Sequence, residues 1–320
     1  QYNVAIGYHA GYSNLISNEN TYIGYQAGYG QLGTDSYGGS TFIGYKAGYS
    51  TSDSGFQRSV AIGAYAGDNS SNSRNTIVGF YAGRYAGSSN VVIGQQAGIA
   101  SSGNSYDNAT IIGFAASALN AGKSDLVAVG YNAAYSGGST RGTYIGNSAG
   151  YSDVAAGTPY NLYMGHWAGY YNSKGTNNVY VGGFSGLYAT GSANTFLGFE
   201  AGKGGTTSAP YSSGENNTFL GYSAGKDFTT GFNNVILGYN AGQNITTAYR
   251  TVAIGSQALE SDTIGHTNVA IGYDTMRLGS GTNQSVAVGQ SALEYFSIGN
   301  NTGTHTTAIG NTAGKYTTGS

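Results

Sequence analysis

The residue types that most often catalyse reactions or bind metals are few in this chain and widely separated. Its 320 residues include no cysteine, 14 carboxylates and four histidines. His9, His166, His266 and His305 show none of the spacings at which metal ligands recur. The carboxylates rarely neighbour one another, whereas acid–base catalysis needs groups that converge on one bond. The sequence therefore predicts no catalytic residues, no metal site and no cofactor, and the expectation is a protein that is not an enzyme.

The elements that would position any such residue come from one motif that fills the chain, as in Asn217-Thr-Phe-Leu-Gly-Tyr-Ser-Ala-Gly225. We call the glycine that follows the aliphatic residue position zero. The motif recurs eighteen times at intervals of 15 to 23 residues, most often 17. Internal periodicity of this kind indicates a repeat architecture along the whole chain. The position-zero glycines are Gly7, Gly24, Gly44, Gly63, Gly79, Gly94, Gly113, Gly130, Gly146, Gly165, Gly182, Gly198, Gly221, Gly238, Gly255, Gly272, Gly289 and Gly310.

Each copy predicts one short strand. Position −3 is Val or Thr in all copies but one, and position −1 is aliphatic or Met in all eighteen. These side chains favour a pleated, half-buried surface over a helix. One strand in every 17 residues leaves about ten for a return path, which suits a parallel β-solenoid whose strands stack about 4.8 Å apart. A barrel or sandwich would instead need strands of varied pattern and alternating direction. The predicted fold is all-β, a parallel β-solenoid of about 18 coils in one domain, residues 1–320, with no cap at either end.

The alternation of side chains predicts which face of each strand is buried. Positions −3, −1, +1 and +3 carry Val or Thr, an aliphatic residue, often Tyr or Phe, and nearly always Ala. A strict period of two places these four positions on one face, which we expect to be the core. By this argument Leu237, at −1, points inward, whereas Ile236, at −2, points outward. Asn at −4 and a second Gly at +4 are interpreted as turn residues.

Composition limits the possible partners. Only 8% of the residues are charged and the net charge is −2, which gives no electrostatic attraction to nucleic acid. No apolar run is long enough to span a membrane. Richness in Gly, Ser, Thr, Asn and Tyr, with repeated coils, favours an exposed fibre over a cytosolic enzyme. The expected location is therefore extracellular, at a cell surface or on a virion.

All variation in length falls between positions +4 and −4, outside the strand. Insertions in solenoids form loops on one side, which is often the binding side. The aromatic residues of these loops are therefore candidates for surface contact, although loops without a binding role are the simpler interpretation. They are Tyr29, Tyr37, Phe56, Tyr106, Tyr151, Tyr160, Tyr211 and Tyr295.

The repeats resemble those of known fibre proteins. Asn234-Val-Ile-Leu-Gly-Tyr-Asn-Ala-Gly242 is similar to the Gly-Tyr-x-Ala repeats of phage tail fibres and other extracellular fibre proteins. Thr267-Asn-Val-Ala-Ile-Gly-Tyr273 resembles, more distantly, the β-roll heads of trimeric autotransporter adhesins. The resemblance covers nearly the whole chain. It implies a β-roll or β-helix, a homotrimer, and a role in structure or attachment.

Two hypotheses follow, with a third behind them. The first is a non-enzymatic structural fibre whose copies associate as a trimer or head to tail in a filament. The filament is suggested because the ten residues after Gly310 and the seven up to Gly7 add up to one repeat. The second is an adhesin or receptor-binding tail fibre that contacts surface glycans through a loop edge. An ice-binding solenoid is the third, suggested by Thr at −3 in eight copies.

Overall fold

The computed structural model describes residues 2–30, 38–50, 57–70, 73–119, 122–154, 159–208, 211–279, 281, 283–298, 305–316 and 318–319. The chain forms two compact units, Gln1–Tyr160 and Asn161–Ser320. Within the described residues each unit contains nine strands of three residues, and all eighteen precede a position-zero glycine. None of the described residues lies in a helix, so none forms a helix that could cross a membrane.

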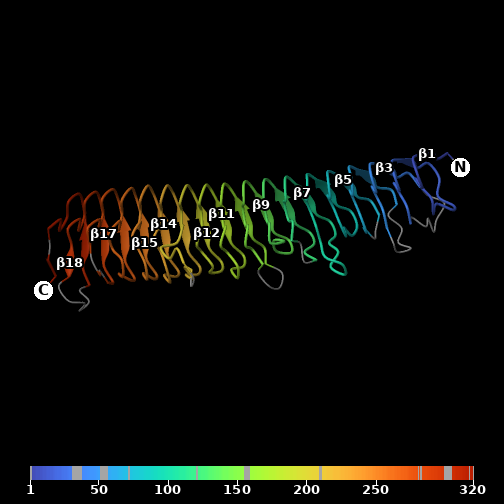
Figure 1. Cartoon of the computed structure of the whole chain (residues 1–320). Coiled ribbons are helices and arrows are strands. Elements are labelled where there is room, and N and C mark those ends of the chain that lie inside the picture. Colours follow the sequence, from blue (N-terminus) through green and yellow to red (C-terminus); the bar gives the residue numbers. More distant parts are fainter. Residues whose placement is uncertain are drawn as a thin grey trace. The chain divides into compact units, whose positions relative to one another are not determined.

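In both units the strands follow one another in chain order and pair in parallel (Figure 1). The register is one repeat against the next, so that Thr218, Phe219 and Leu220 lie beside Val235, Ile236 and Leu237. The predicted parallel β-solenoid is thereby confirmed. The strands of the first unit are β1 (Val4–Ile6), β2 (Thr21–Ile23), β3 (Thr41–Ile43), β4 (Val60–Ile62), β5 (Thr76–Val78), β6 (Val91–Ile93), β7 (Thr110–Ile112), β8 (Val127–Val129) and β9 (Thr143–Ile145).

The second unit repeats this arrangement and adds a small pair of two-residue strands, β18 and β20, which also run parallel. Its strands are β10 (Leu162–Met164), β11 (Val179–Val181), β12 (Thr195–Leu197), β13 (Thr218–Leu220), β14 (Val235–Leu237), β15 (Val252–Ile254), β16 (Val269–Ile271), β17 (Val286–Val288), β18 (Ser297–Ile298), β19 (Thr307–Ile309) and β20 (Thr318–Gly319).

The position-zero glycine brings neighbouring coils closer than any other residue would allow. Gly238 has φ +137°, a backbone conformation that L side chains rarely adopt. A Cβ atom there would lie only 2.4 Å from the carbonyl oxygen of Gly255 in the next coil. The N–H of Gly238 donates a 2.9 Å hydrogen bond to the carbonyl oxygen of Leu220 in the preceding coil. Glycine is thus required here for both conformation and space.

This glycine also ends the strand, and for that reason the predicted assignment of faces is wrong. The residue at −2 is buried in every strand after β1, whereas −3 and −1 are partly or fully exposed. Ile236 is 0% exposed, while its neighbour Val235 is 38% exposed. Beyond Gly238, Asn240 at +2 also has positive φ, so the alternation of a continuous strand does not extend to +3. Ala241 at +3 consequently enters the core together with Ile236.

In many coils the size of the residue at −2 is related to that of the residue at +4. Where −2 is aromatic, +4 is glycine, because a Cβ on Gly202 would lie 2.4 Å from the ring of Phe196. Where β15, β16 and β17 have Ala at −2, the +4 residue is large, and it is fully or almost fully buried in each case. Close packing explains this exchange, since a void in a core removes contacts from every atom that lines it. The large +4 residues are Leu259, Met276 and Leu293.

Asparagine at −4 does more than form a turn. Asn217 is 1% exposed, and its Oδ1 accepts a 3.1 Å hydrogen bond from the backbone N–H of Asn234. Its Nδ2 donates a 2.9 Å bond to the carbonyl oxygen of Gly231. Asn178 and Asn194 bond to the next coil in the same way, at 2.8 Å and 2.9 Å. The side chain therefore satisfies buried backbone groups that the short strand leaves unpaired.

The buried −2 position gives a direct test of the corrected faces. Ile236→Asp places an unpaired carboxylate in the core and should lower the free energy of unfolding by about 4 kcal/mol or more. Leu237→Asp lies on the open face and should cost about 1 kcal/mol or less in the single chain. Chemical denaturation of the two variants, at concentrations where the chain is monomeric, measures both values. Equal losses, or a larger loss for Leu237→Asp, would contradict this assignment.

Candidate functional site

The described residues contain no group of three or more His, Cys, Asp or Glu that could hold a metal ion. His9, His166 and His266 make ring contacts instead, as His9 does with Tyr8 at a centroid distance of 3.9 Å. Asp153 is fully buried and accepts hydrogen bonds from the hydroxyls of Tyr144, at 2.7 Å, and Ser139, at 2.6 Å. Burial, followed by the charge of Asp153, raises the pKa of Tyr144 well above its usual value. These contacts hold the coil together.

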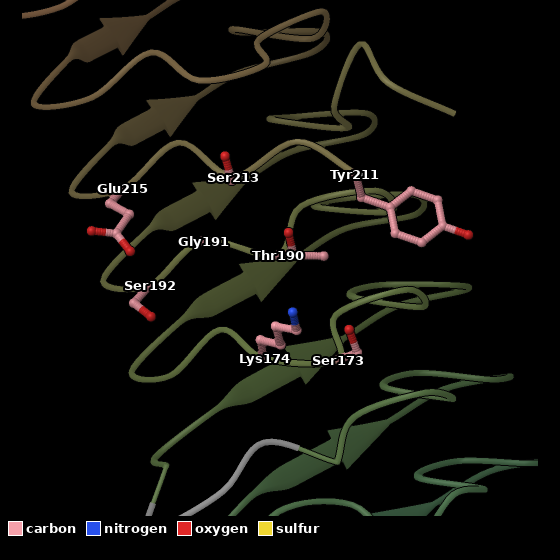
Figure 2. A pocket seen from close by; sticks show the side chains of 8 residues that line it. All are labelled: Ser173, Lys174, Thr190, Gly191, Ser192, Tyr211, Ser213 and Glu215. Atoms are coloured by element: carbon pink, nitrogen blue, oxygen red, sulfur yellow. The ribbon is translucent and has the colours of Figure 1, made fainter. Parts of the chain in front are cut away.

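One hollow of about 620 Å³ opens on the second unit (Figure 2). It spans three successive coils, those that follow Gly165, Gly182 and Gly198. Its volume lies within the range of ordinary ligand sites, but polar side chains predominate in its lining. The lining residues are Ser173, Lys174, Thr190, Gly191, Ser192, Tyr211, Ser213 and Glu215.

Differences in coil length and side-chain size produce this hollow. The middle coil is short, with an interval of 16 residues from Gly182 to Gly198. The next coil is the longest, with an interval of 23 residues from Gly198 to Gly221. At the floor, a Cβ atom on Gly191 would lie 2.0 Å from the carbonyl oxygen of Gly214, so only glycine fits. The wall is held by hydrogen bonds, among them that from the N–H of Thr190 to the carbonyl oxygen of Ser212, at 2.7 Å.

The charges that line the hollow differ from the ion-paired group around Glu200 in the same unit. Glu200 forms ion pairs with Lys203, at 2.7 Å, and Lys226, at 2.8 Å. Partial burial alone would raise the pKa of Glu200, but hydrogen bonds from the two lysines outweigh it and lower that pKa. By contrast, Lys174 and Glu215 are exposed and, among the described residues, form no ion pair. Both charges are therefore available to a bound molecule.

A second surface feature is the tyrosine edge, which we define as the tyrosines at +5 or +6 together with Tyr211. Rings from successive coils stack on it, as in Tyr12 on Tyr29, with centroids 5.5 Å apart, and Tyr29 on Tyr49, 5.4 Å apart. Stacked and offset ring pairs are favoured contacts. The remaining members of the edge are Tyr85, Tyr135, Tyr151, Tyr170, Tyr171, Tyr188, Tyr295 and Tyr316.

Several of the loop aromatics predicted from the sequence lie on these two features. Tyr29 and Tyr151 belong to the tyrosine edge, and Tyr151 stacks on Tyr135. Tyr211 lines the hollow and stacks on Tyr171. These three predicted residues are partly exposed and thus lie on surface features of their own units.

The other predicted residues have varied surroundings. Tyr295, which also belongs to the tyrosine edge, is 39% exposed and stacks on Tyr316. Tyr160 is 56% exposed and accepts a hydrogen bond from Arg141. Tyr106 was expected on the surface but is 0% exposed, and its hydroxyl donates a 2.6 Å bond to the carbonyl oxygen of Gly98. It fills the coil interior, so it cannot contact a partner. Tyr37 and Phe56 lie outside the described residues.

Sequence reasoning missed Lys174, Glu215 and the partner rings of the tyrosine edge. The recurrence of tyrosine five or six residues after the glycine was a signal that would have identified the edge. No comparable pattern marks Lys174 or Glu215, because the hollow depends on the unequal lengths of three coils.

The third feature is the open face of the sheet, which we call the strand face and define by positions −3, −1 and +1. Large apolar side chains are exposed along it, including Leu220 at 41% and Tyr222 at 49%. Its aromatic rings stack from coil to coil, as in Phe199–Tyr222 at 5.5 Å and Tyr222–Tyr239 at 5.4 Å. In all eighteen copies these three positions carry no charged residue. Each unit thus presents an ordered apolar surface.

Comparison of the chain with protein-family models and with curated proteins finds no match. The resemblance to fibre repeats therefore rests on the repeat motif alone. The arguments about function rest on the hollow, the tyrosine edge and the strand face.

Proposed function

We propose that the chain is a non-enzymatic structural fibre protein of an extracellular or particle surface, and that its copies associate through the strand face. The observation that carries this proposal is the recurrent exposure of aliphatic side chains at −1 and of Tyr or Phe at +1. Soluble monomers rarely expose contiguous apolar patches larger than a few hundred Å². A repeated face of this kind resembles half of a hydrophobic core, which is typical of permanent interfaces between subunits.

The distribution of charge supports the same surface. Several charged residues stand at +2 and +5 and pair with each other there, as Glu260 and Asp274 do with Arg277. The strand face is free of them, which matches the depletion of charge at the centre of protein interfaces. An apolar face without charge offers little to a polar substrate, but it is complementary to another copy of itself.

The resemblance to adhesin heads implies three chains. A closed trimer lets each chain bury its strand face against its partners, with no unpaired surface left over. The single chain closes its own core with the −2 and +3 residues, so association adds a second apolar layer. Head-to-tail stacking along the axis on which coils follow one another is the alternative mode, and it would produce filaments instead of closed particles.

The state of association tests this proposal. One chain has a mass of 32.7 kDa, and sedimentation equilibrium should give three times that mass. Leu220→Lys places a charge on the strand face and should shift the protein to monomers without loss of the far-ultraviolet spectrum. Thr263→Lys, at an exposed site away from this face, is the matched control and should remain a trimer. A wild-type protein that sediments as one chain at high concentration would overturn the proposed interface.

The second candidate function is contact with surface glycans, and the hollow favours it. Its lining offers five hydroxyl groups, and sugars are recognised by hydrogen bonds to groups of that kind. They belong to Ser173, Thr190, Ser192, Tyr211 and Ser213. Lys174 and Glu215 add an unpaired donor and acceptor, whose hydrogen bonds are stronger because they carry charge. A fibre with such a hollow would serve as an adhesin or a receptor-binding tail fibre.

Binding to a glycan array, followed by titration of the hits, tests this second function. The double variant Lys174→Gln with Glu215→Gln should weaken binding by about ten- to a hundredfold, the value of one or two charged hydrogen bonds. Lys46→Gln, which removes a lysine from the other unit, should leave binding unchanged. An array without hits would count against glycan contact, and so would binding that is insensitive to the double variant. Neither result would affect the proposed fibre.

A further inference from the structure

The tyrosine edge places phenol rings of consecutive coils against each other with little variation. Tyr135 and Tyr151 have centroids 4.8 Å apart and planes inclined by only 2°. The stacks of Tyr12 on Tyr29 and Tyr29 on Tyr49 have planes inclined by 13° in both cases. The same relation therefore recurs at different coils of the chain.

The backbone holds these rings in register. The N–H of Ser136, next to Tyr135, donates a 3.0 Å hydrogen bond to the carbonyl oxygen of Tyr151. The N–H of Ser50 donates a bond of the same length to the carbonyl oxygen of Tyr29, beside the stack with Tyr49. The backbone pairing of neighbouring coils consequently holds each pair of rings in contact before any reaction takes place.

We propose that neighbouring tyrosines of this edge form a modification site, at which one-electron oxidation joins them as dityrosine and links one coil covalently to the next. Each phenol loses one electron and one proton, and the two phenoxyl radicals form a carbon–carbon bond between positions ortho to their oxygens. The two ortho hydrogens then return to the oxygens as the rings regain aromaticity. With hydrogen peroxide as the oxidant, a peroxidase delivers these two electrons and two protons to it and yields two molecules of water.

Accessibility and proximity favour this site. Tyr12 is 63% exposed, and Tyr135 and Tyr151 are each partly exposed, so a diffusing oxidant reaches the edge. Burial, and then the nearby Tyr135 and Tyr131, raise the pKa of Tyr151, so its phenol stays protonated near neutral pH. Two groups held in one chain face each other at a local concentration on the order of millimolar. Coupling within the chain should therefore exceed coupling between dilute chains.

The consequence would be a covalent cross-link in a chain that has no cysteine with which to form a disulfide. The sequence contains 30 tyrosines and no cysteine. A bond between Tyr135 and Tyr151 would close a short loop of chain and reduce the freedom of the unfolded state, as a disulfide does. This property goes beyond the proposed fibre function, and it does not involve the strand face.

The test uses the full chain, treated with a haem peroxidase and hydrogen peroxide at micromolar protein. Half of the protein carries nitrogen-15. Trypsin cleavage after Lys123, Arg141 and Lys174 places Tyr135 and Tyr151 in different peptides. Mass spectrometry should detect these two peptides joined through Tyr135 and Tyr151. Both peptides of a joined pair should carry the same nitrogen isotope, because the link forms within one chain. The oxidised protein should also unfold at a higher temperature than the untreated protein.

Tyr151→Phe is the decisive variant, because it keeps a stacking ring but removes the phenol. The linked peptides of Tyr135 should fall by about tenfold or more, while the melting temperature before oxidation stays unchanged. Tyr160→Phe removes an exposed tyrosine from the same tryptic peptide and should have no effect. The proposal would be overturned if cross-links were spread over exposed tyrosines without preference, or if most linked peptides contained both nitrogen isotopes. It would also be overturned if no cross-link formed under conditions that oxidise free tyrosine.

Discussion

The close approach of successive position-zero glycines is the contact on which the remaining structure depends. At Gly221 the backbone turns with φ +140°, and a Cβ atom would lie 2.3 Å from the carbonyl oxygen of Gly238. Only glycine can therefore occupy position zero, and its small size lets each coil pack directly on the next. Because the glycine also ends the strand after three residues, it decides which side chains enter the core. The repeat is therefore built around a backbone contact, with the side chains arranged to suit it.

Two further regularities follow from that geometry. The coil interior has room for one large group near the turn, so an aromatic residue at −2 is matched by glycine at +4, and Ala253 at −2 by Leu259 at +4. The strand is too short to satisfy every backbone group, and Asn234 supplies the missing bonds through its side chain, to Thr251 and Ala248. With the interior filled by −2 and +3, the aliphatic −1 residues are left outside. Their exposure is the reason to expect partner chains.

The sequence predicted the parts of the fold that repeat, and it failed where a single backbone angle intervenes. The strand positions and the parallel solenoid follow from the recurrence of the motif, and the structure bears both out. The faces were reversed because the period of two assumes an unbroken strand, whereas Gly238 interrupts it at φ +137°. Tyr106 was expected outside because it lies in a long loop, yet its ring returns to fill the core. The hollow beside Lys174 depends on the offset between unequal coils, which no local pattern encodes.

A comparison of two glycine substitutions by equilibrium denaturation tests the central claim most directly. Gly281→Ala introduces a side chain at φ +64°, with its nearest neighbour 3.7 Å away, so it should cost about 1 to 2 kcal/mol of unfolding free energy. Gly238→Ala adds the same methyl group 2.4 Å from the carbonyl oxygen of Gly255. It should cost several kcal/mol more, because the two coils must separate to accept it. Equal losses in the two variants would show that neither the φ of +137° nor the close contact adds to the cost, and would contradict the central role of this glycine.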